Sequence, residues 1–297
     1  FPNDIGYFYN ILSQFFYSTF QLMIKTLPTV PSFQLGWFRS TFLMLSAYSV
    51  FRMRGQSVPV KSPKVNTILL LRGLTGFLSN ALLFYGLRYA PLGEGIVVME
   101  MYPAIAALLS VFLLGEKYTL TQFLYTIFCI AGAALIIKPG FLFPADELTT
   151  PDAARYIGLI SIFGSAFTVA LSVVIVRKQA LSKVDTLTGM FYTGFVQMAL
   201  FPVAMLFQGA KAVTLVEFGK MMVLGVLGMI AQYMFNHSLH FGDASKISLM
   251  GYSEMIFGYL LDIVVLGTQP DMFSIIGSIM IFSCVFVQMY DLSKKRK

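Results

Sequence analysis

The chain of 297 residues is 57% hydrophobic and only 12% charged, with a mean hydropathy of +0.75. A soluble globular domain carries about twice that fraction of charge, so the composition indicates a polytopic protein of the lipid bilayer. The net charge of +7 does not indicate nucleic-acid binding, because the lysines and arginines fall in short loops between apolar runs and in the tail 294–297.

The first half contains five segments that we expect to cross the bilayer as helices, each about 20 residues long. The first is unusually polar, with amides and hydroxyls that lipid cannot satisfy, so we expect it to face protein or a cavity. The five segments lie at about 7–25, 33–51, 67–89, 95–115 and 120–138.

A polar break at 139–151 is the longest in the chain and is typical of a linker. Five more apolar segments follow it, at about 156–176, 186–207, 218–241, 245–267 and 272–290. The sequence therefore predicts an all-α polytopic membrane protein of ten transmembrane helices. We divide it into a first repeat at 1–139, a linker at 140–154 and a second repeat at 155–297.

The two halves share one design at a constant spacing. When the second half is aligned with the first without gaps, one constant shift in residue number pairs Leu87 with Leu239 and Gly115 with Gly267. Because each half has an odd number of helices, the second copy must lie upside down relative to the first, as an inverted repeat. Basic residues are concentrated in the loops on one side, which places both termini on the cytoplasmic side or the equivalent side of an organelle.

Glu100 and Glu254 are the strongest candidates for a polar site inside the membrane. Each interrupts an apolar run and is expected several residues into its helix, where an ionisable group costs about 2.5–3.5 kcal/mol. The shift pairs Glu100 with Tyr252 and Tyr102 with Glu254, so each half contributes one carboxylate and one phenol near the midplane. There a carboxylate can bind a cationic group or carry a proton, or it can serve only to fix helix positions.

Four further polar residues fall within the expected helices. Asn80 and Gln232 correspond under the same shift, and their amides can orient a substrate or join helices. Arg39 and Arg72 are expected near helix ends, where they can snorkel, although Arg39 can also bind an anion. Glu116 is expected at the membrane interface.

Metal and disulfide chemistry are not expected. His237 and His240 are three residues apart but have no third ligand nearby in the sequence. Cys129 and Cys284 lie inside apolar runs and are typical of small core residues. No cofactor motif and no nucleophile–base constellation occurs, so we do not expect an enzyme.

Several motifs carry a resemblance to a known family. YGLRYAPLGEGIVV, MYPAIAALLS, LLGEKYTLTQ and IAGAALIIKPGFLF resemble the EamA-type drug/metabolite transporter superfamily, and KYTLTQFLYTIFCIAGAALIIKPGFLF is most similar to the G branch of solute carrier family 35. The resemblance implies a ten-helix transporter with a central cavity lined by helices one, three, four, six, eight and nine. Family substrates include amino acids, nucleotide sugars and organic anions. The second half matches more loosely, since Met255 and Thr268 stand where the first half has Pro103 and Glu116.

The first hypothesis is therefore a secondary transporter that moves a small polar metabolite by alternating access. Two acids favour a cationic substrate or proton coupling, whereas the two arginines allow an anionic substrate. The alternative is a non-transporting, degenerate carrier that acts as a structural subunit of a larger membrane complex. Either protein can form a homodimer or a larger assembly.

Overall fold

The computed structural model describes residues 2–27, 29–58, 62–86, 89, 98–137, 152–266 and 272–294. Of the expected linker, 140–151 lies outside these ranges and 152–154 belongs to the first turn of the helix Asp152–Leu181. The described chain is helical apart from turns and contains no strand. Its helices are α1 (Pro2–Lys25), α2 (Ser32–Met53), α3 (Pro63–Gly86), α5 (Tyr102–Leu114), α6 (Leu120–Ile137), α7 (Asp152–Leu181), α8 (Thr186–Gln208), α9 (Leu215–Phe241), α10 (Ala244–Leu249), the 3₁₀ turn η1 (Met250–Tyr252), α11 (Ser253–Leu266) and α12 (Met272–Lys294).

Length and composition confirm the membrane class. Within the described chain, α3, α7, α8 and α9 each contain a stretch long and apolar enough to cross a bilayer, and α5, α6 and α12 contain shorter apolar stretches. Large apolar side chains such as Phe112 and Leu206 point outward and are more than 80% exposed in the isolated chain. A soluble protein rarely exposes so much apolar surface, whereas lipid covers it in a multi-pass membrane protein.

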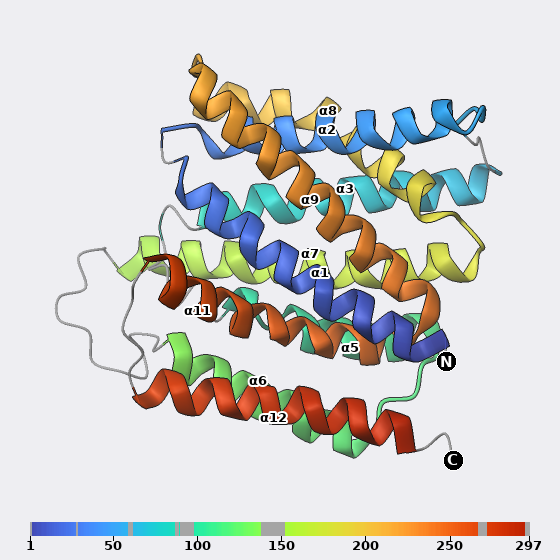
Figure 1. Ribbon diagram of the computed structural model, residues 1–297, viewed down its shortest axis with the longest axis vertical. Helices are drawn as coiled ribbons and strands as arrows, with labels where there is room; N and C mark the ends of the chain where they lie inside the picture. The colour runs from blue at the N-terminus through green and yellow to red at the C-terminus, as the bar shows by residue number, and fades with distance from the viewer. Residues whose placement is uncertain are drawn as a thin grey trace.

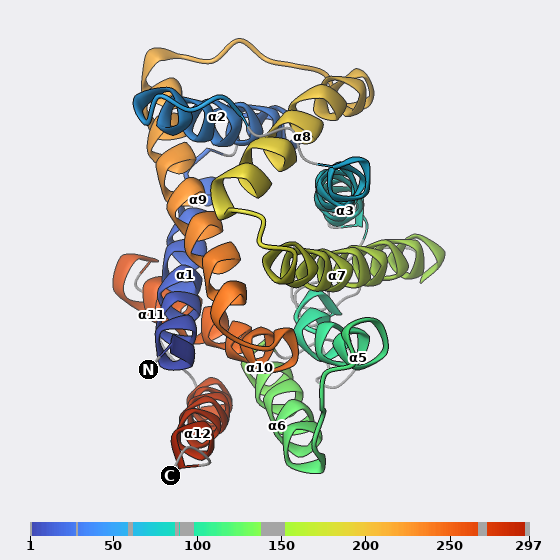
Figure 2. The ribbon, with the colours of Figure 1, turned by 90° about the vertical axis from the view of Figure 1, so that its right-hand side faces the viewer.

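The main helix contacts join the first half of the chain to the second. α1 packs against α9 and α11, while α7 packs against α3 and α5. α2 lies along α8 and α6 lies along α12, and these two pairs form opposite ends of the long axis (Figure 1). Seen along the helices, α1, α9 and α11 form one wall and α3, α5 and α7 form the wall facing it (Figure 2).

Small residues and hydroxyls hold these helices together. The Ser165 hydroxyl of α7 donates to the Ser79 carbonyl of α3 at 2.7 Å, and the Ser172 hydroxyl donates to Thr75 at the same distance. A Cβ on Gly86 would lie 2.5 Å from Ile162, so only glycine permits this approach of α3 and α7. Close backbone approach and interhelical hydrogen bonds are the means by which helices associate in lipid, where the hydrophobic effect between helices is absent.

Two of the expected helices are interrupted. The expected helix at 245–267 is broken by η1 into α10 and α11. In the expected helix at 95–115, Glu100 and Met101 form a turn and α5 begins only at Tyr102. Pro103 explains the second break, because its ring lacks an N–H and would clash with the carbonyl four residues earlier in a continuous helix. The sequence had placed both glutamates several residues inside continuous helices. That expectation is wrong, because each of them lies at a break.

Candidate functional site

One face of α1 is lined with polar side chains that are buried between α9 and α11. The Asn10 amide donates to the Ile247 carbonyl at 2.6 Å, and the Gln14 amide donates to the Asn10 side chain at 2.6 Å. One turn further along, the Ser18 hydroxyl lies 2.8 Å from the Glu254 carbonyl. The polar side chains of α1 thus donate hydrogen bonds to backbone carbonyls of α10 and α11. These carbonyls lie beside the helix break and need donors that lipid cannot supply.

The two glutamates of the predicted site both lie at helix breaks. Glu254 is the second residue of α11, and its carboxylate accepts a hydrogen bond from the Gln21 amide at 2.5 Å. Glu100 lies in the turn before α5, and its Oε2 is buried without a hydrogen-bond partner in the described chain. The two carboxylates lie close enough to interact electrostatically. The structure therefore brings together two acidic groups that are far apart in the sequence.

The two tyrosines of the predicted site accompany these acids. Tyr102 lies close to both carboxylates, and its hydroxyl is held against the backbone of Gly251 in η1. Tyr252 is fully buried in the apolar core, close to Glu100 and Cys129, and its hydroxyl has no partner among the described residues. The four residues paired by the sequence shift thus meet where the two helix breaks face each other.

Arg39 forms a second polar centre with Gln232. Its Nη2 donates to the Gln232 Oε1 at 3.2 Å, and the Gln232 amide in turn donates to Asn236 at 3.0 Å. The guanidinium also lies over the Phe20 ring, with its central carbon 5.1 Å from the ring centroid. These contacts orient Arg39, but no acidic partner for it occurs in the part of the chain that the structure describes.

Arg72 lies in the middle of α3 and is only 6% exposed, so the expectation that it snorkels from a helix end is wrong. It lies close enough to Arg39 to interact with it electrostatically, and its Nε has no hydrogen-bond partner within the described ranges. Asn80 lies two turns further along α3 and is half-buried. Tyr17 of α1, a residue that sequence reasoning missed, lies close to Arg39, Arg72 and Glu254.

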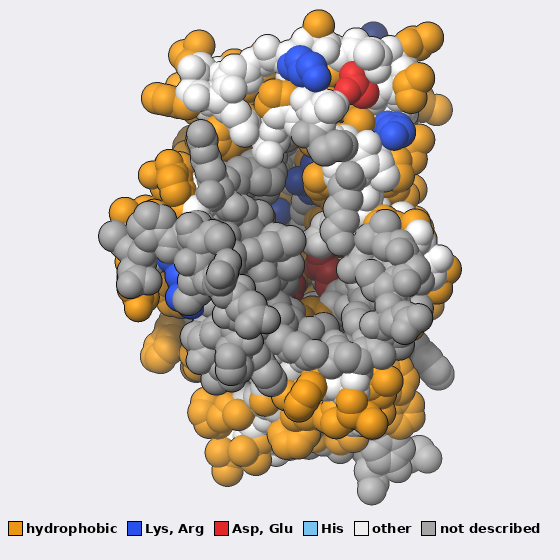
Figure 3. All heavy atoms as spheres, turned by 90° about the vertical axis from the view of Figure 1, so that its left-hand side faces the viewer, with side chains coloured by type: hydrophobic (Ala, Val, Ile, Leu, Met, Phe, Trp, Pro, Cys, Tyr) orange, Lys and Arg blue, Asp and Glu red, His pale blue; other side chains and the backbone are white. Residues whose placement is uncertain are grey.

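Charged side chains are visible inside the molecule from one side (Figure 3). Figure 3 looks from the side opposite to that on which α1 begins and α12 ends. On this face the surface is hollowed, and acidic atoms and Lys or Arg atoms are visible within the hollow, with the basic atoms nearer the α2 and α8 end. A polar recess between the two walls is therefore open to this side.

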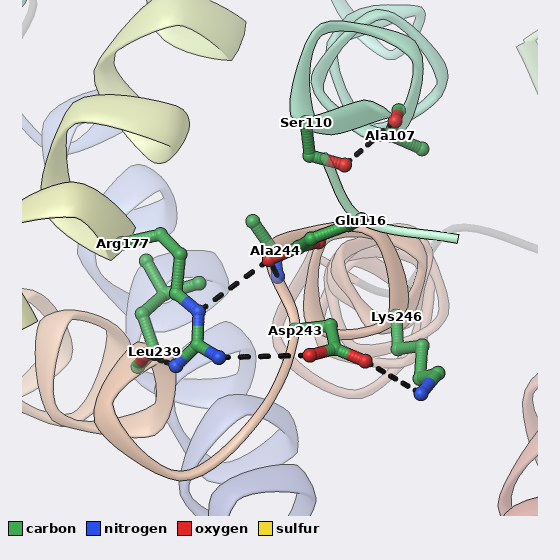
Figure 4. A network of polar contacts seen from close by, with 8 residues as sticks. All are labelled: Ala107, Ser110, Glu116, Arg177, Leu239, Asp243, Ala244 and Lys246. Carbon is green, nitrogen blue, oxygen red and sulfur yellow. Dashed lines mark hydrogen bonds and ion pairs between the residues drawn. The ribbon is translucent and has the colours of Figure 1, made fainter. Parts of the chain in front are cut away.

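The other side, where α1 begins and α12 ends (the terminal side), is joined by an ionic network (Figure 4). Arg177 at the end of α7 lies 3.5 Å from Glu116 and 3.5 Å from Asp243, and it donates to the Leu239 carbonyl at 2.7 Å. Asp243 also pairs with Lys246 at 2.6 Å. The network links the end of α5 to the junction of α9 and α10.

Glu116 follows the end of α5, at the helix end where the sequence placed it, and is buried within this network. Its side chain is 9% exposed, and its carboxylate accepts a hydrogen bond from the Ala244 backbone at 3.0 Å, at the start of α10. Gly115 makes this possible because it ends α5 in the left-handed conformation, with φ of 67°. The sequence showed that Glu116 follows a glycine, but it did not show that Arg177 and the Ala244 backbone contact its carboxylate.

The two histidines lie on the terminal side of α9 with Thr186 between them. The Thr186 hydroxyl lies 3.3 Å from the His237 Nδ1 and 3.3 Å from the His240 Nε2. Tyr9, Tyr233 and Phe241 surround the His237 ring. In the searched, described residues no group of three potential metal ligands occurs.

Comparison with known proteins agrees with this architecture of a multi-pass membrane protein built around a polar recess. The model of the EamA-like transporter family matches residues 4–138 and 156–290. The chain belongs to the EamA-like transporter family.

Named relatives are similar over most of the chain. It is 25% identical to "Solute carrier family 35 member G1" of Homo sapiens, over 93% of this chain and 76% of that protein. It is 24% identical to "Pseudopaline exporter CntI" of Pseudomonas aeruginosa, over 91% of each chain. It is also 24% identical to "S-adenosylmethionine uptake transporter" of Rickettsia prowazekii, over 92% of this chain and 88% of that protein. Among solved structures, one crystallised protein shares the fold with a TM-score of 0.81 at 20% identity, over 95% of this chain and 97% of that one.

Proposed function

We propose that this protein is a secondary transporter that moves a small polar metabolite across its membrane by alternating access. The observation that carries the proposal is the group of charged side chains, Arg39, Arg72 and Glu100, whose buried polar atoms lack a hydrogen-bond partner in the described chain where its two halves meet. Buried charges are costly, so in a membrane protein they are retained where they act on a substrate or ion. The substrate site consists of Arg39, Asn80, Glu100, Tyr102, Gln232, Tyr252 and Glu254.

The packing supports an inverted repeat as the basis of alternating access. α1 contacts α9 and α11 in the way that α7 contacts α3 and α5, as expected of two equivalent units related by a twofold axis. In this state the recess opens to one side while the Glu116–Arg177–Asp243 network joins the other. With the termini cytoplasmic, the network closes the cytoplasmic side, and it must break for the opposite state to form.

The relatives support transport as such. The Pseudomonas aeruginosa relative is named an exporter and the Rickettsia prowazekii relative an uptake transporter, so proteins of this family move solutes in either direction. The chain covers most of each relative, and the family model matches both of its halves. We infer that the same core acts here on a metabolite that the polar groups of the recess select.

Transport by purified protein in proteoliposomes tests the proposal. Vesicles loaded with a pH-sensitive dye receive radiolabelled amino acids, dicarboxylates or amines, and both uptake and internal pH are followed. We expect Glu100→Gln combined with Glu254→Gln to reduce uptake at least tenfold and to abolish its pH dependence. Glu217→Gln, at the exposed start of α9, is the matched control and should behave as wild type.

Two results would contradict the proposal. If the double variant keeps the rate and pH dependence of the wild type, the two carboxylates only fix helix positions. If the wild type moves none of the probes and purifies with a stable partner against its apolar flank, the structural-subunit alternative replaces the transporter.

A further inference from the structure

Between the two walls lie two arginines for which the described residues provide no acidic partner. Arg72 is 6% exposed, its Nε has no hydrogen-bond partner among the described residues, and it lies close enough to Arg39 to interact with it electrostatically. Arg39 is held by an amide and an aromatic ring, and its Nε is likewise buried without a partner in the described chain. Two guanidiniums that lie near each other, one buried and one partly buried, repel each other and lose hydration, which is unfavourable unless an anion lies between them.

Two acids also lie there for which the described residues provide no basic partner. Glu254 receives only an amide hydrogen bond from Gln21, and the Glu100 Oε2 has no hydrogen-bond partner among the described residues. No ion pair joins either glutamate to Arg39 or Arg72 in the part of the chain that the structure describes. The positive and negative groups are therefore held apart, although their mutual attraction would favour direct contact.

The two pairs of charges come from elements at different positions along the long axis. The arginines come from α2 and α3, towards the α2 and α8 end of the long axis, and the acids come from the breaks beside α5 and α11, towards the α6 and α12 end (Figure 1). Tyr17 lies close to both arginines and to Glu254, and Tyr102 lies close to Tyr17 and to both acids. The two phenols thus bridge the space between the positive and the negative end.

A ligand of a single sign would neutralise only one end of this recess. A dianion would satisfy the arginines and face two carboxylates, and a diamine would satisfy the carboxylates and face two arginines. A molecule with one anionic and one cationic group offers a partner to each end at once, and it adds no net charge that must be moved across the membrane potential. Charge complementarity therefore favours a zwitterion over ions of either sign.

We propose that the substrate is a zwitterionic metabolite, with its anionic group bound between Arg39 and Arg72 and its cationic group bound at Glu100 and Glu254. This inference rests on the proposed transport function and specifies its substrate class. The apolar middle of the ligand lies against the rings of Tyr17 and Tyr102.

A series of linear probes of equal length tests the charge requirement. δ-Aminovalerate is a zwitterion, glutarate is its dianionic counterpart and cadaverine is its dicationic counterpart. Shorter and longer members of each series, from three to six carbons, allow for the spacing of the two ends. In thermal-shift and equilibrium-binding measurements on the purified protein at neutral pH, we expect an ω-amino acid to bind at least tenfold more tightly than the matched diacid and diamine.

Charge-removal variants should then change the selectivity in opposite directions. Arg72→Gln leaves the acids as the dominant charge, so the preference should move from the zwitterion towards the diamine. Glu100→Gln combined with Glu254→Gln should move it towards the diacid. Arg52→Gln, on the exposed end of α2, is the control and should leave the preference unchanged. A variant that merely unfolds would lose all three probes together and would not reverse their order.

The proposal is overturned if glutarate or cadaverine binds as tightly as the zwitterion, or if no ω-amino acid of the series binds. It is also overturned if Arg72→Gln weakens all probes equally in a folded protein. Uptake of a diacid or diamine by proteoliposomes would reject the zwitterion but leave the transporter function standing, so the two proposals fail separately.

Discussion

A single amide determines how Arg39 presents its charge to the recess. The Gln232 Oε1 accepts from the Arg39 Nη2, and Gln232 is itself fixed by Asn236 on the same helix. A hydrogen bond to a charged group contributes about 1.5–3 kcal/mol, and about 1.4 kcal/mol corresponds to a tenfold change in affinity. Gln232→Leu should therefore weaken binding of δ-aminovalerate about tenfold and lower the unfolding temperature.

Gln232→Glu separates binding from stability at this position. The added carboxylate keeps an acceptor for Arg39 and pairs with it, so the unfolding temperature should be kept, while neutralisation of Arg39 should still weaken binding of the anionic group. Calorimetric titration and thermal unfolding of each variant measure the two effects. Gln179→Leu, a buried amide of α7 with a single long contact of 3.4 Å, is the control. Wild-type affinity in Gln232→Glu would mean that Arg39 does not bind the substrate.

At the scale of elements, the two helix breaks depend on close contact between Gly251 and Tyr102. A Cβ on Gly251 would lie 2.6 Å from the Tyr102 hydroxyl, which is closer than real Cβ contacts allow. Overpacking of this kind costs about 1–3 kcal/mol, so Gly251→Ala should lower the unfolding temperature and displace Tyr102 from the acids, with loss of transport.

Removal of the Tyr102 hydroxyl should relieve the clash. Gly251→Ala combined with Tyr102→Phe is expected to regain most of the lost stability, as measured by thermal unfolding. Gly258→Ala, where an added Cβ meets nothing within 4 Å, should be neutral or slightly stabilising because alanine favours the helix. If Gly251→Ala is as well tolerated as Gly258→Ala, the breaks do not depend on this contact.

The sequence predicted the helices well but not their interruptions. Hydrophobic runs located the elements because a membrane helix must be apolar over most of its length. The break before α5 had a local signal in Pro103, but the break at η1 has no proline and depends on contacts with α1 and α5. Arg72 was misplaced because the start of α3 lies four residues earlier than the apolar run, which puts the arginine in the middle of the helix.

At the scale of the whole molecule, the chain's duplication explains why distant residues form one recess. The shift along the sequence paired Glu100 with Tyr252 and Tyr102 with Glu254, and the structure brings these four together. The ionic network on the terminal side was not foreseen, because Glu116, Arg177 and Asp243 come from three separated segments and share no periodic pattern. Internal similarity in the sequence thus indicated the site more clearly than the residues that join the helices beside it.

Arg177 is the residue whose loss should shift the balance between the two states of the transporter. It contacts Glu116 and Asp243 at once, and removal of one member of a partly buried ionic group leaves the others unpaired. In the proposed alternating-access cycle this network breaks when the terminal side opens, so Arg177→Gln should destabilise the closed state relative to the opposite one. A change of about 1.4 kcal/mol alters the ratio of the two states tenfold.

Side-specific labelling measures this shift. A cysteine at Asn80, in a protein whose Cys129 and Cys284 are replaced by alanine, reports which side of the membrane reaches the recess. In sealed vesicles, Arg177→Gln should increase its labelling by a membrane-impermeant maleimide from the terminal side and decrease labelling from the other side. Lys178→Gln, the exposed neighbour on α7, should change neither rate. Equal labelling of Arg177→Gln and wild type from both sides would show that the network does not close the transporter, and the closure of this side would then have to depend on the packing of α10 against α5.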